Sequence, residues 1–432
     1  MSVHKRSFRS RSRTAKKNSW MYWALWPLLV TAILLSGGCA PSVPGTQVPD
    51  QVAPMMAQRE LNEQELLNVS IMIFDPGQLP VNGEQSRGLS PEIREAEARF
   101  VPVHLKYTMQ RTGFWGAVRV VPDDDNGSEI LVSGKIEYSD GESAVLSVEA
   151  VDSRNILWFR KTYAETSRSF EHNATEPEKE DIFQDLFNTI ANDLAAYRNQ
   201  LHPREVEQIR QIAELRYGAE MVPDVFGRYL AMDPQGRINL VHLPSSGDPM
   251  LTRVRTIKAR DDMLIDAING YYEAYYRDLW EPYSNWRKFR TEEVLAMRQL
   301  EREALTQQVL GVAAIVGAIA LGASADLDTR IRTSTLQNVM IAGGAYAVYS
   351  GTQKRAESAI NKEAIEELGT SFSSEAEPLV IEVEGETIRL TGTAEQQYAR
   401  WRKLLRDLYA KETGLIDSAP PSPDQFDPAP TP

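Results

Sequence analysis

The chain has 432 residues, 42% hydrophobic and 25% charged, an ordinary globular composition that argues against wholesale disorder and predicts two or three folded units. Its 60 acidic and 47 basic side chains give a net charge of −13, which argues against a nucleic-acid surface, since such surfaces need clustered Lys and Arg. The single cysteine, Cys39, excludes an intramolecular disulfide, a cysteine-based zinc site and a CxxC redox pair.

The basic residues are concentrated at the amino terminus. Residues 1–38 contain seven basic side chains and no acidic one, so the remainder carries 40 basic and 60 acidic side chains. An apolar run from Trp20 to Leu35 follows the basic stretch, and Ser36-Gly37-Gly38-Cys39 comes directly after it. A basic region, an apolar region and small residues in this order are the parts of a secretion signal.

This segment resembles a bacterial lipoprotein signal, which implies cleavage after residues 1–38 and attachment of a lipid to the thiol of Cys39. Such signals usually have Leu three residues before the cysteine, whereas Ser36 stands there and Leu35 precedes it. The alternative is an uncleaved signal anchor, although an apolar run of about 16 residues is short for a spanning helix, which needs about 20. Because Ala40 rather than Asp follows the cysteine, the resemblance implies an outer-membrane location facing the periplasm.

Residues 39–62 include four prolines, at Pro41, Pro44, Pro49 and Pro54. Proline removes backbone donors and favours extended chain. We therefore expect a lipidated tether that leads to the first folded unit.

Residues 63–172 predict a mixed α/β domain. Val69–Phe74 is an apolar run of strand length, and Ser90-Pro91 places an N-cap before a proline at the first helical position. That helix is expected to reach about Arg111, with a kink or a break at Pro102. Four strands with about half of their positions apolar, as in a sheet with one covered face, are expected at Ala117–Val121, Glu129–Tyr138, Ala144–Val151 and Ile156–Tyr163.

The order of these elements resembles the TolB amino-terminal group, which includes the curli-secretion lipoprotein and the penicillin-binding-protein activator. The matching positions are Gly113, Phe114, Val120, Val121, Gly134, Ile136, Asp152, Ile156 and Trp158. Two positions depart from the pattern, because Glu129 replaces an Asp and Asn155 replaces a Gly in the last turn. The resemblance covers about 100 of the 432 residues and implies a fold and a compartment rather than a reaction.

Residues 173–376 follow a helical pattern. The apolar periodicity predicts helices over Glu178–Gln200, Pro203–Leu215 and Thr252 to about Gln308, with a loop at Met232–Met250. Pro282 is expected to interrupt the longest helix.

This longest helix carries aromatic side chains three or four residues apart, a spacing that places them on one face. Packing between helices is one interpretation, and a surface that binds a protein partner or a sugar polymer is the other, because Tyr and Trp are favoured at interfaces. The candidate partner-binding residues are Tyr272, Tyr275, Tyr276, Trp280, Tyr283 and Trp286.

Two uncharged segments, Val309–Ala325 and Thr335–Gly351, predict a hairpin of small-residue helices over residues 309–351. Small residues four apart leave a groove in which another helix can approach closely. Burial, packing in a homo-oligomer and membrane insertion all remain open, since each segment is at the lower limit of length for spanning. The candidate helix-packing residues are Ala313, Ala314, Gly317, Ala318, Gly322, Gly343 and Gly344.

Residues 377–414 predict a β-hairpin and a helix. Leu379–Val383 and Glu386–Leu390 flank a two-residue turn, and Thr393–Tyr409 is amphipathic. Residues 415–432 are proline-rich and predict a disordered tail. The fold class expected for the chain is α+β.

Sequence signatures of catalysis are missing. The chain has no G-x-x-x-x-G-K-[ST], G-x-G-x-x-G, G-x-S-x-G or HExxH motif, so we expect no catalytic residues, metal site or cofactor. The first hypothesis is an outer-membrane lipoprotein that scaffolds or activates an envelope machine for secretion, surface-structure assembly or cell-wall synthesis. The alternatives are an oligomeric channel or membrane-inserting protein built on residues 309–351, and an unrecognised periplasmic hydrolase.

Overall fold

The protein is seen in a computed structural model that describes residues 45–79, 89–124, 127–166, 181–321, 359–370, 379–383 and 386–413. These residues belong to one compact unit. An amino-terminal sheet with its helices, a helical half and a terminal β-hairpin confirm the expected α+β class. Helices α3 (Gln184–Arg198) and α6 (Pro249–Leu321) contact strands of the sheet, so the ranges 63–172 and 173–376 contribute to the same unit.

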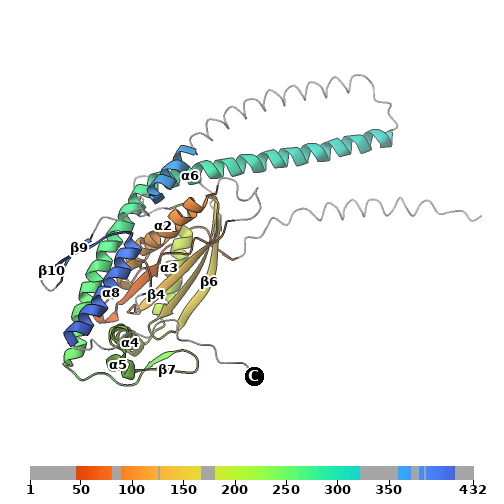
Figure 1. Cartoon of the computed structure of the whole chain (residues 1–432). Helices are drawn as coiled ribbons and strands as arrows, with labels where there is room; N and C mark the ends of the chain where they lie inside the picture. Colours follow the sequence, from red (N-terminus) through yellow and green to blue (C-terminus); the bar gives the residue numbers. More distant parts are fainter. Residues whose placement is uncertain are drawn as a thin grey trace, which may run out of the picture. The chain divides into compact units, whose positions relative to one another are not determined.

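The sheet has six strands in the order β1-β6-β5-β4-β2-β3 (Figure 1). Strand β2 is parallel to both β3 and β4, whereas β4, β5 and β6 form an antiparallel meander, and the short edge strand β1 is parallel to β6. The strands expected from the sequence are confirmed with shifted ends. The observed bounds are β1 Thr46–Gln47, β2 Leu67–Met72, β3 Trp115–Val121, β4 Ile130–Ser139, β5 Ser143–Asp152 and β6 Leu157–Thr166.

Two backbone positions in the sheet need particular residues. Asn155, in the turn between β5 and β6, has a φ of 60°, a left-handed conformation that Asn tolerates better than most residues other than Gly. Asn155 can therefore occupy the turn position at which the sequence pattern described above has Gly. Gly134 lies under the ring of Phe74, where an added Cβ would come 2.2 Å from the ring.

Helix α2 (Pro91–Gln110) connects β2 to β3, as parallel neighbouring strands require. Its N-cap is Ser90, whose hydroxyl accepts from the N–H of Ile93 (3.3 Å), as expected. Of the kink or break expected at Pro102, the break is wrong, because the helix continues through that residue. Pro102 leaves the carbonyl of Ala98 without its helical donor, and the N–H of Phe74 donates to that oxygen instead (3.1 Å).

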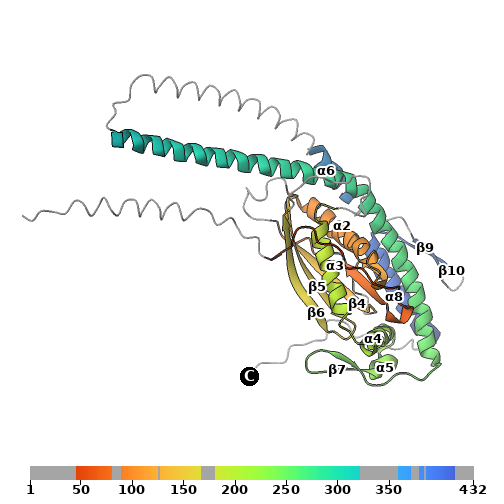
Figure 2. The same cartoon turned by 180° about the vertical axis from the view of Figure 1, so that it is seen from behind.

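Helices α2 and α3 lie side by side on the sheet (Figures 1 and 2). Helix α3 (Gln184–Arg198) begins later than predicted, and α4 (Pro203–Met221) extends further. The expected loop at 232–250 overlaps a small hairpin of β7 and β8. The remaining short elements are η1 Glu63–Glu65, α5 Pro223–Phe226, η2 Gly227–Tyr229, β7 Leu230–Met232 and β8 Ile238–Leu240.

Helix α6 (Pro249–Leu321) has 73 residues and packs against α2, α4, α8 and β3. It starts before the predicted Thr252 because Asp248 accepts from the N–H of Met250 (2.8 Å) and Pro249 occupies the first turn. The expected interruption at Pro282 is wrong, since the helix is continuous there. In Figures 1 and 2 its last part, coloured teal, continues beyond the elements that pack on its first half.

The carboxy-terminal elements match the prediction. Strands β9 (Leu379–Val383) and β10 (Glu386–Leu390) form an antiparallel pair, and α8 (Ala394–Thr413) follows. Helix α8 is fixed to α6 and α4, because the guanidinium of Arg402 pairs with Asp261 at 2.6 Å and with Glu220 at 2.5 Å. Residues 359–370 are also helical.

Two hydrophobic clusters form the core. One lies between the sheet and the side of α2 and α3 that faces it, and includes Val69, Leu105 and Leu186. The other lies between α2, α4, α6 and α8, and includes Phe100 and Trp401. Helix α2 contributes to both, so it is enclosed between the sheet and α6.

Candidate functional site

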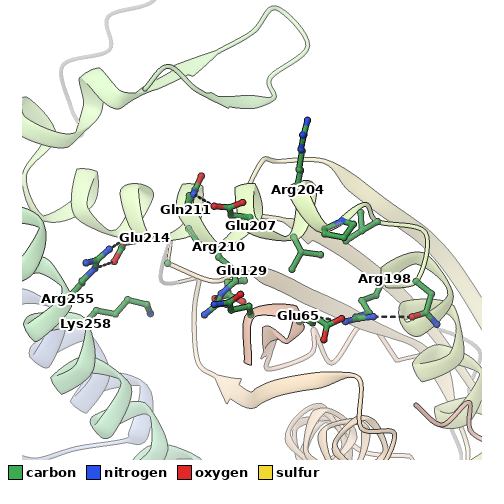
Figure 3. Close-up of a pocket in the computed structure, with 17 residues that line it drawn as sticks. Glu65, Glu129, Arg198, Arg204, Glu207, Arg210, Gln211, Glu214, Arg255 and Lys258 are labelled. Carbon is green, nitrogen blue, oxygen red and sulfur yellow. Dashed lines mark hydrogen bonds and ion pairs between the residues drawn. The ribbon is translucent and has the colours of Figure 1, made fainter. Parts of the chain in front are cut away.

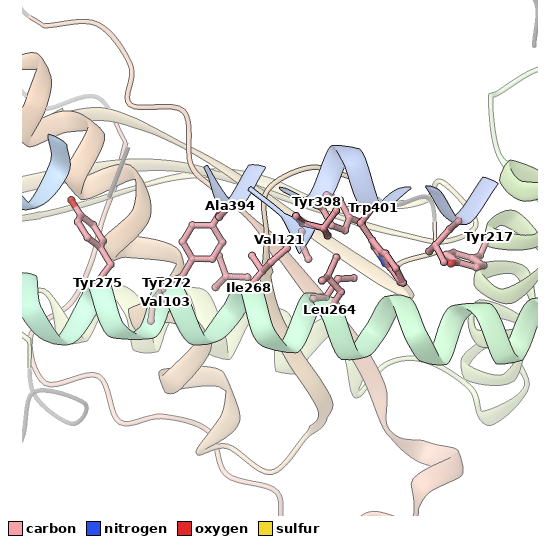
Figure 4. Packing of buried hydrophobic residues seen from close by; sticks show 14 of the residues in the cluster. Val103, Val121, Tyr217, Leu264, Ile268, Tyr272, Tyr275, Ala394, Tyr398 and Trp401 are labelled. Atoms are coloured by element: carbon pink, nitrogen blue, oxygen red, sulfur yellow. The ribbon is translucent and has the colours of Figure 1, made fainter. Parts of the chain in front are cut away.

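The aromatic face of α6 lies in the core. Tyr272, Tyr275, Tyr276, Trp280, Tyr283 and Trp286 are each at most 6% exposed. In Figure 4, Tyr272 and Tyr275 project from α6 toward the elements that cover it, with Ala394 of α8 close to Tyr272. Of the two interpretations left open by the sequence, the structure shows packing between helices.

The partner of this face is largely α2. The ring of Phe100 stacks on Tyr276 (4.7 Å between centroids) and on Trp280 (5.8 Å), and meets Tyr283 edge-on (4.9 Å). The prediction of an accessible partner-binding surface at these six residues is therefore wrong, because α2 and α8 already cover it. Periodicity identifies the face of a helix, but it does not identify what covers that face.

A chain of polar contacts crosses this core. His104 of α2 contacts the hydroxyl of Tyr276 through Nδ1 (2.8 Å) and the Gln184 side chain through Nε2 (2.9 Å). Burial lowers the pKa of His104, so the ring is neutral, with Nδ1 accepting from Tyr276 and Nε2 donating to Gln184. Gln184 in turn donates to Asn188 of α3 (2.9 Å). These contacts join α6, α2 and α3.

A buried ion pair lies beside this chain. The guanidinium of Arg287 donates to both carboxylate oxygens of Asp181 (2.9 and 2.6 Å), and both side chains are at most 1% exposed. The Arg287 guanidinium also lies over the ring of Tyr283, whose hydroxyl donates to Glu97 (2.8 Å). These charged groups hold α6 against α2 and the start of α3.

A groove of about 830 Å³ lies beside α4 (Figure 3). Its lining alternates in charge. The basic members are Arg198, Arg204, Arg210, Arg255 and Lys258, and the acidic members are Glu65, Glu129, Glu207 and Glu214.

Most of these charges already have structural partners. Arg198 and Arg210 donate to the carbonyl oxygens of Glu65 (2.7 Å) and Glu63 (3.2 Å), so both hold η1 in place. Arg255 pairs with Glu214 at 2.5 Å. The charged side chains of the groove therefore do not form a recognisable cluster of catalytic residues. Among the described residues, no group of acidic, His and Cys side chains could hold a metal ion.

Glu129, a carboxylate of the groove, has a raised pKa. Burial raises it, while hydrogen bonds from the Asn68 backbone (2.7 Å) and side chain (3.2 Å) and the charge of Arg210 act in the opposite direction. Both oxygens therefore serve to fix β2 beside β4. We assign the groove a structural role on these contacts.

A row of polar side chains on α3 is a feature that sequence reasoning missed. Asp185, Asn188 and Asn192 are three and four residues apart, so they share one face of the helix. They bind the backbone of residues 51–55 (2.6–2.9 Å). Residues 51–55, which belong to the tether expected at 39–62, are therefore bound to α3. The spacing of the three residues was the available signal.

The remaining predicted residues are placed as follows. Ala313, Ala314, Gly317 and Ala318 lie in the last part of α6, while Cys39, Gly322, Gly343 and Gly344 lie outside the described residues. Among the described residues, no helix combines the length and the apolar character needed to cross a membrane.

Comparison with known proteins adds no assignment, since no family model and no curated protein matches the chain.

Proposed function

We propose that this protein is an outer-membrane lipoprotein, attached through Cys39 and facing the periplasm, that acts without catalysis as a scaffold or activator of an envelope machine. The cationic leader, the small residues before Cys39 and the resemblance of residues 63–172 to the TolB amino-terminal group support the compartment. The partner is an envelope protein.

The observation that carries the proposal is that α6 is packed against the rest of the protein along its first half and extends beyond it along its second half. Its first half is built into the body as far as Thr291, whose hydroxyl donates to the carbonyl of Gly141 (3.2 Å). The helix then continues to Leu321, and at 1.5 Å per residue those roughly 30 residues add about 45 Å. A body that fixes one half of a long helix and extends the other half is suited to presenting that helix to a partner.

Attachment through Cys39 is tested by metabolic labelling with an alkyne analogue of palmitate in a diderm bacterial host. We expect the protein to be labelled and found in the outer-membrane fraction, and C39S to lose all of the label, since the chain has no second cysteine. Label that persists in C39S, or a wild-type protein that takes up none, would contradict lipidation.

The partner is tested by in-cell photocrosslinking from positions in residues 292–321 of α6. A control crosslinker at Met263, an exposed position (64%) on the first half of the same helix, accounts for random collisions. We expect adducts with one envelope protein from the last part of α6 and none from Met263. A ladder of self-adducts would favour the oligomeric channel built on residues 309–351, and no specific adduct would contradict the scaffold.

A further inference from the structure

Residues 45–57, here called the strap, are part of the segment expected as a tether and run across α3. The strap begins at the sheet, where Thr46 and Gln47 of β1 pair with Tyr163 and Ala164 of β6. It ends where the N–H of Ala57 donates to the carbonyl of Thr112 (2.8 Å).

Between these ends the strap is held by side chains of α3. Asp185 accepts from the backbone N–H groups of Gln51 and Val52, each at 2.8 Å. Asn188 donates to the carbonyl of Val52 (2.7 Å), and Asn192 bridges the carbonyl of Ala53 (2.9 Å) and the N–H of Met55 (2.6 Å).

The contacts with α3 are polar and lie at the surface, and only toward the two ends of the strap do partly buried apolar side chains, Val48 and Ala57, pack against the core. No residue from 45 to 57, all of which the structure describes, is buried. Segments with few buried apolar contacts and exposed hydrogen bonds open locally far more often than the core does. The strap therefore has the features of a segment that unfolds locally while the rest of the protein stays folded, whereas β5 and β6 do not.

One residue of the strap is strained in the bound position. Gln51 has a φ of 62°, a left-handed conformation that side chains other than Gly and Asn rarely adopt. Its N–H is one of the two donors to Asp185, so the carboxylate holds the strained turn in place. Release of the strap relieves this strain.

The strap decides how far the body can lie from Cys39. Five residues lie between Cys39 and Gly45, so six Cα-to-Cα steps join them, a distance of about 20 Å at full extension. If the strap is released as far as Ala57, the same calculation gives about 60 Å.

We propose that the strap is a detachable part of the anchoring tether, held on α3 by Asp185, Asn188 and Asn192, and that its release triples the reach of the lipid-anchored body. This inference rests on the proposed lipidation of Cys39. The occupied row also connects to α6, because Asn188 accepts from Gln184, which contacts His104 and through it Tyr276.

Release is measured by hydrogen exchange of the full chain. We expect peptides covering residues 45–57 to exchange faster than those of β5 and β6. D185A removes two charge-assisted hydrogen bonds and should speed exchange of the strap by about tenfold to a hundredfold, without changing exchange in the sheet. Q51G relieves the left-handed strain and should slow exchange of the strap several-fold. The control is D193N, since that carboxylate of the same helix binds Lys161 and Tyr163 instead of the strap.

Reach is measured by energy transfer in liposomes that hold the lipidated protein. When Cys39 carries the lipid, M263C supplies the only free thiol for a donor dye, and labelled lipid is the acceptor. We expect D185A to lower the transfer and Q51G to raise it.

The two parts of the inference fail separately. If strap peptides exchange together with β5 and β6, or if D185A leaves them unchanged, the detachable strap is wrong even when Cys39 is labelled. If exchange follows the expectation but Cys39 takes up no palmitate, the proposed function fails while the strap remains a segment that unfolds locally. Equal energy transfer in all variants would overturn the change in reach.

Discussion

Replacing Arg287 by alanine is expected to lower the free energy of unfolding by about 3 to 5 kcal/mol, because it leaves the buried carboxylate of Asp181 without its counter-charge. The two side chains share two hydrogen bonds at 2.9 and 2.6 Å and are at most 1% exposed. Burial alone would raise the pKa of Asp181, but the charge and hydrogen bonds of Arg287 and the hydrogen bond from the N–H of Phe183 act against it, and the pKa lies below its usual value. Denaturant unfolding followed by tryptophan fluorescence measures the loss.

A double variant separates the ion pair from packing. R287M combined with D181N removes both charges and keeps much of the volume, so it should recover a large part of the loss. If R287A alone costs less than about 1 kcal/mol, the pair does not hold α6 to the body in the way described.

Replacing Glu165 by glutamine is expected to stabilise the protein at pH 8 by roughly 3 to 5 kcal/mol relative to the wild type. Burial raises the pKa of Glu165 to about 8, and the negative charges of Asp185, Asp181 and Asp50 act in the same direction, while the N–H of Leu186 opposes them. The unfolded chain ionises near pH 4.5, so the folded state holds a proton that the unfolded state has lost.

The sign of the pH dependence follows from that difference. The contribution of Glu165 to the free energy of unfolding is fully present below about pH 4.5 and is lost as the pH rises to about 8. The pH dependence that comes from His104 has the opposite sign. Burial lowers the pKa of His104, so its contribution to the free energy of unfolding is lost as the pH falls below about 6.5. The cleanest window is therefore pH 6.5 to 8. Unfolding of the wild type and E165Q at matched pH values isolates Glu165, and parallel stability profiles would contradict the raised pKa.

Local chemistry allowed the sheet and its flanking elements to be predicted. Ser90 and Pro91 start α2 as expected, and the pairing of β9 with β10 follows from the two-residue turn. The errors at Pro102 and Pro282 have a different origin. The missing helical bond at Pro102 is replaced by Phe74, a sheet residue far away in the sequence, and no local rule anticipates such a donor.

The interpretation of the aromatic face as an accessible surface failed for a similar reason. The spacing of Tyr272 and Tyr276 correctly predicts a shared face, but the burial of that face depends on α2 and α8. Pro49 and Pro54 belong to the segment expected as a tether, but the polar row that binds residues 51–55 lies on α3, more than 130 residues later. Both outcomes depend on contacts between distant segments, which composition and periodicity do not encode.

The two charged clusters on α6 have a mechanical consequence. Asp261 is bound by Arg402 of α8, and Arg287 is bound by Asp181 before α3, so the helix is clamped at two points about 40 Å apart along its axis. Two points of attachment prevent α6 from turning about either one. A sideways force on the last part of α6 therefore acts mainly on the nearer attachment, the Arg287–Asp181 pair. A pull on the last part of α6 would thus load the Arg287 pair first, beside the same α3 that holds the strap.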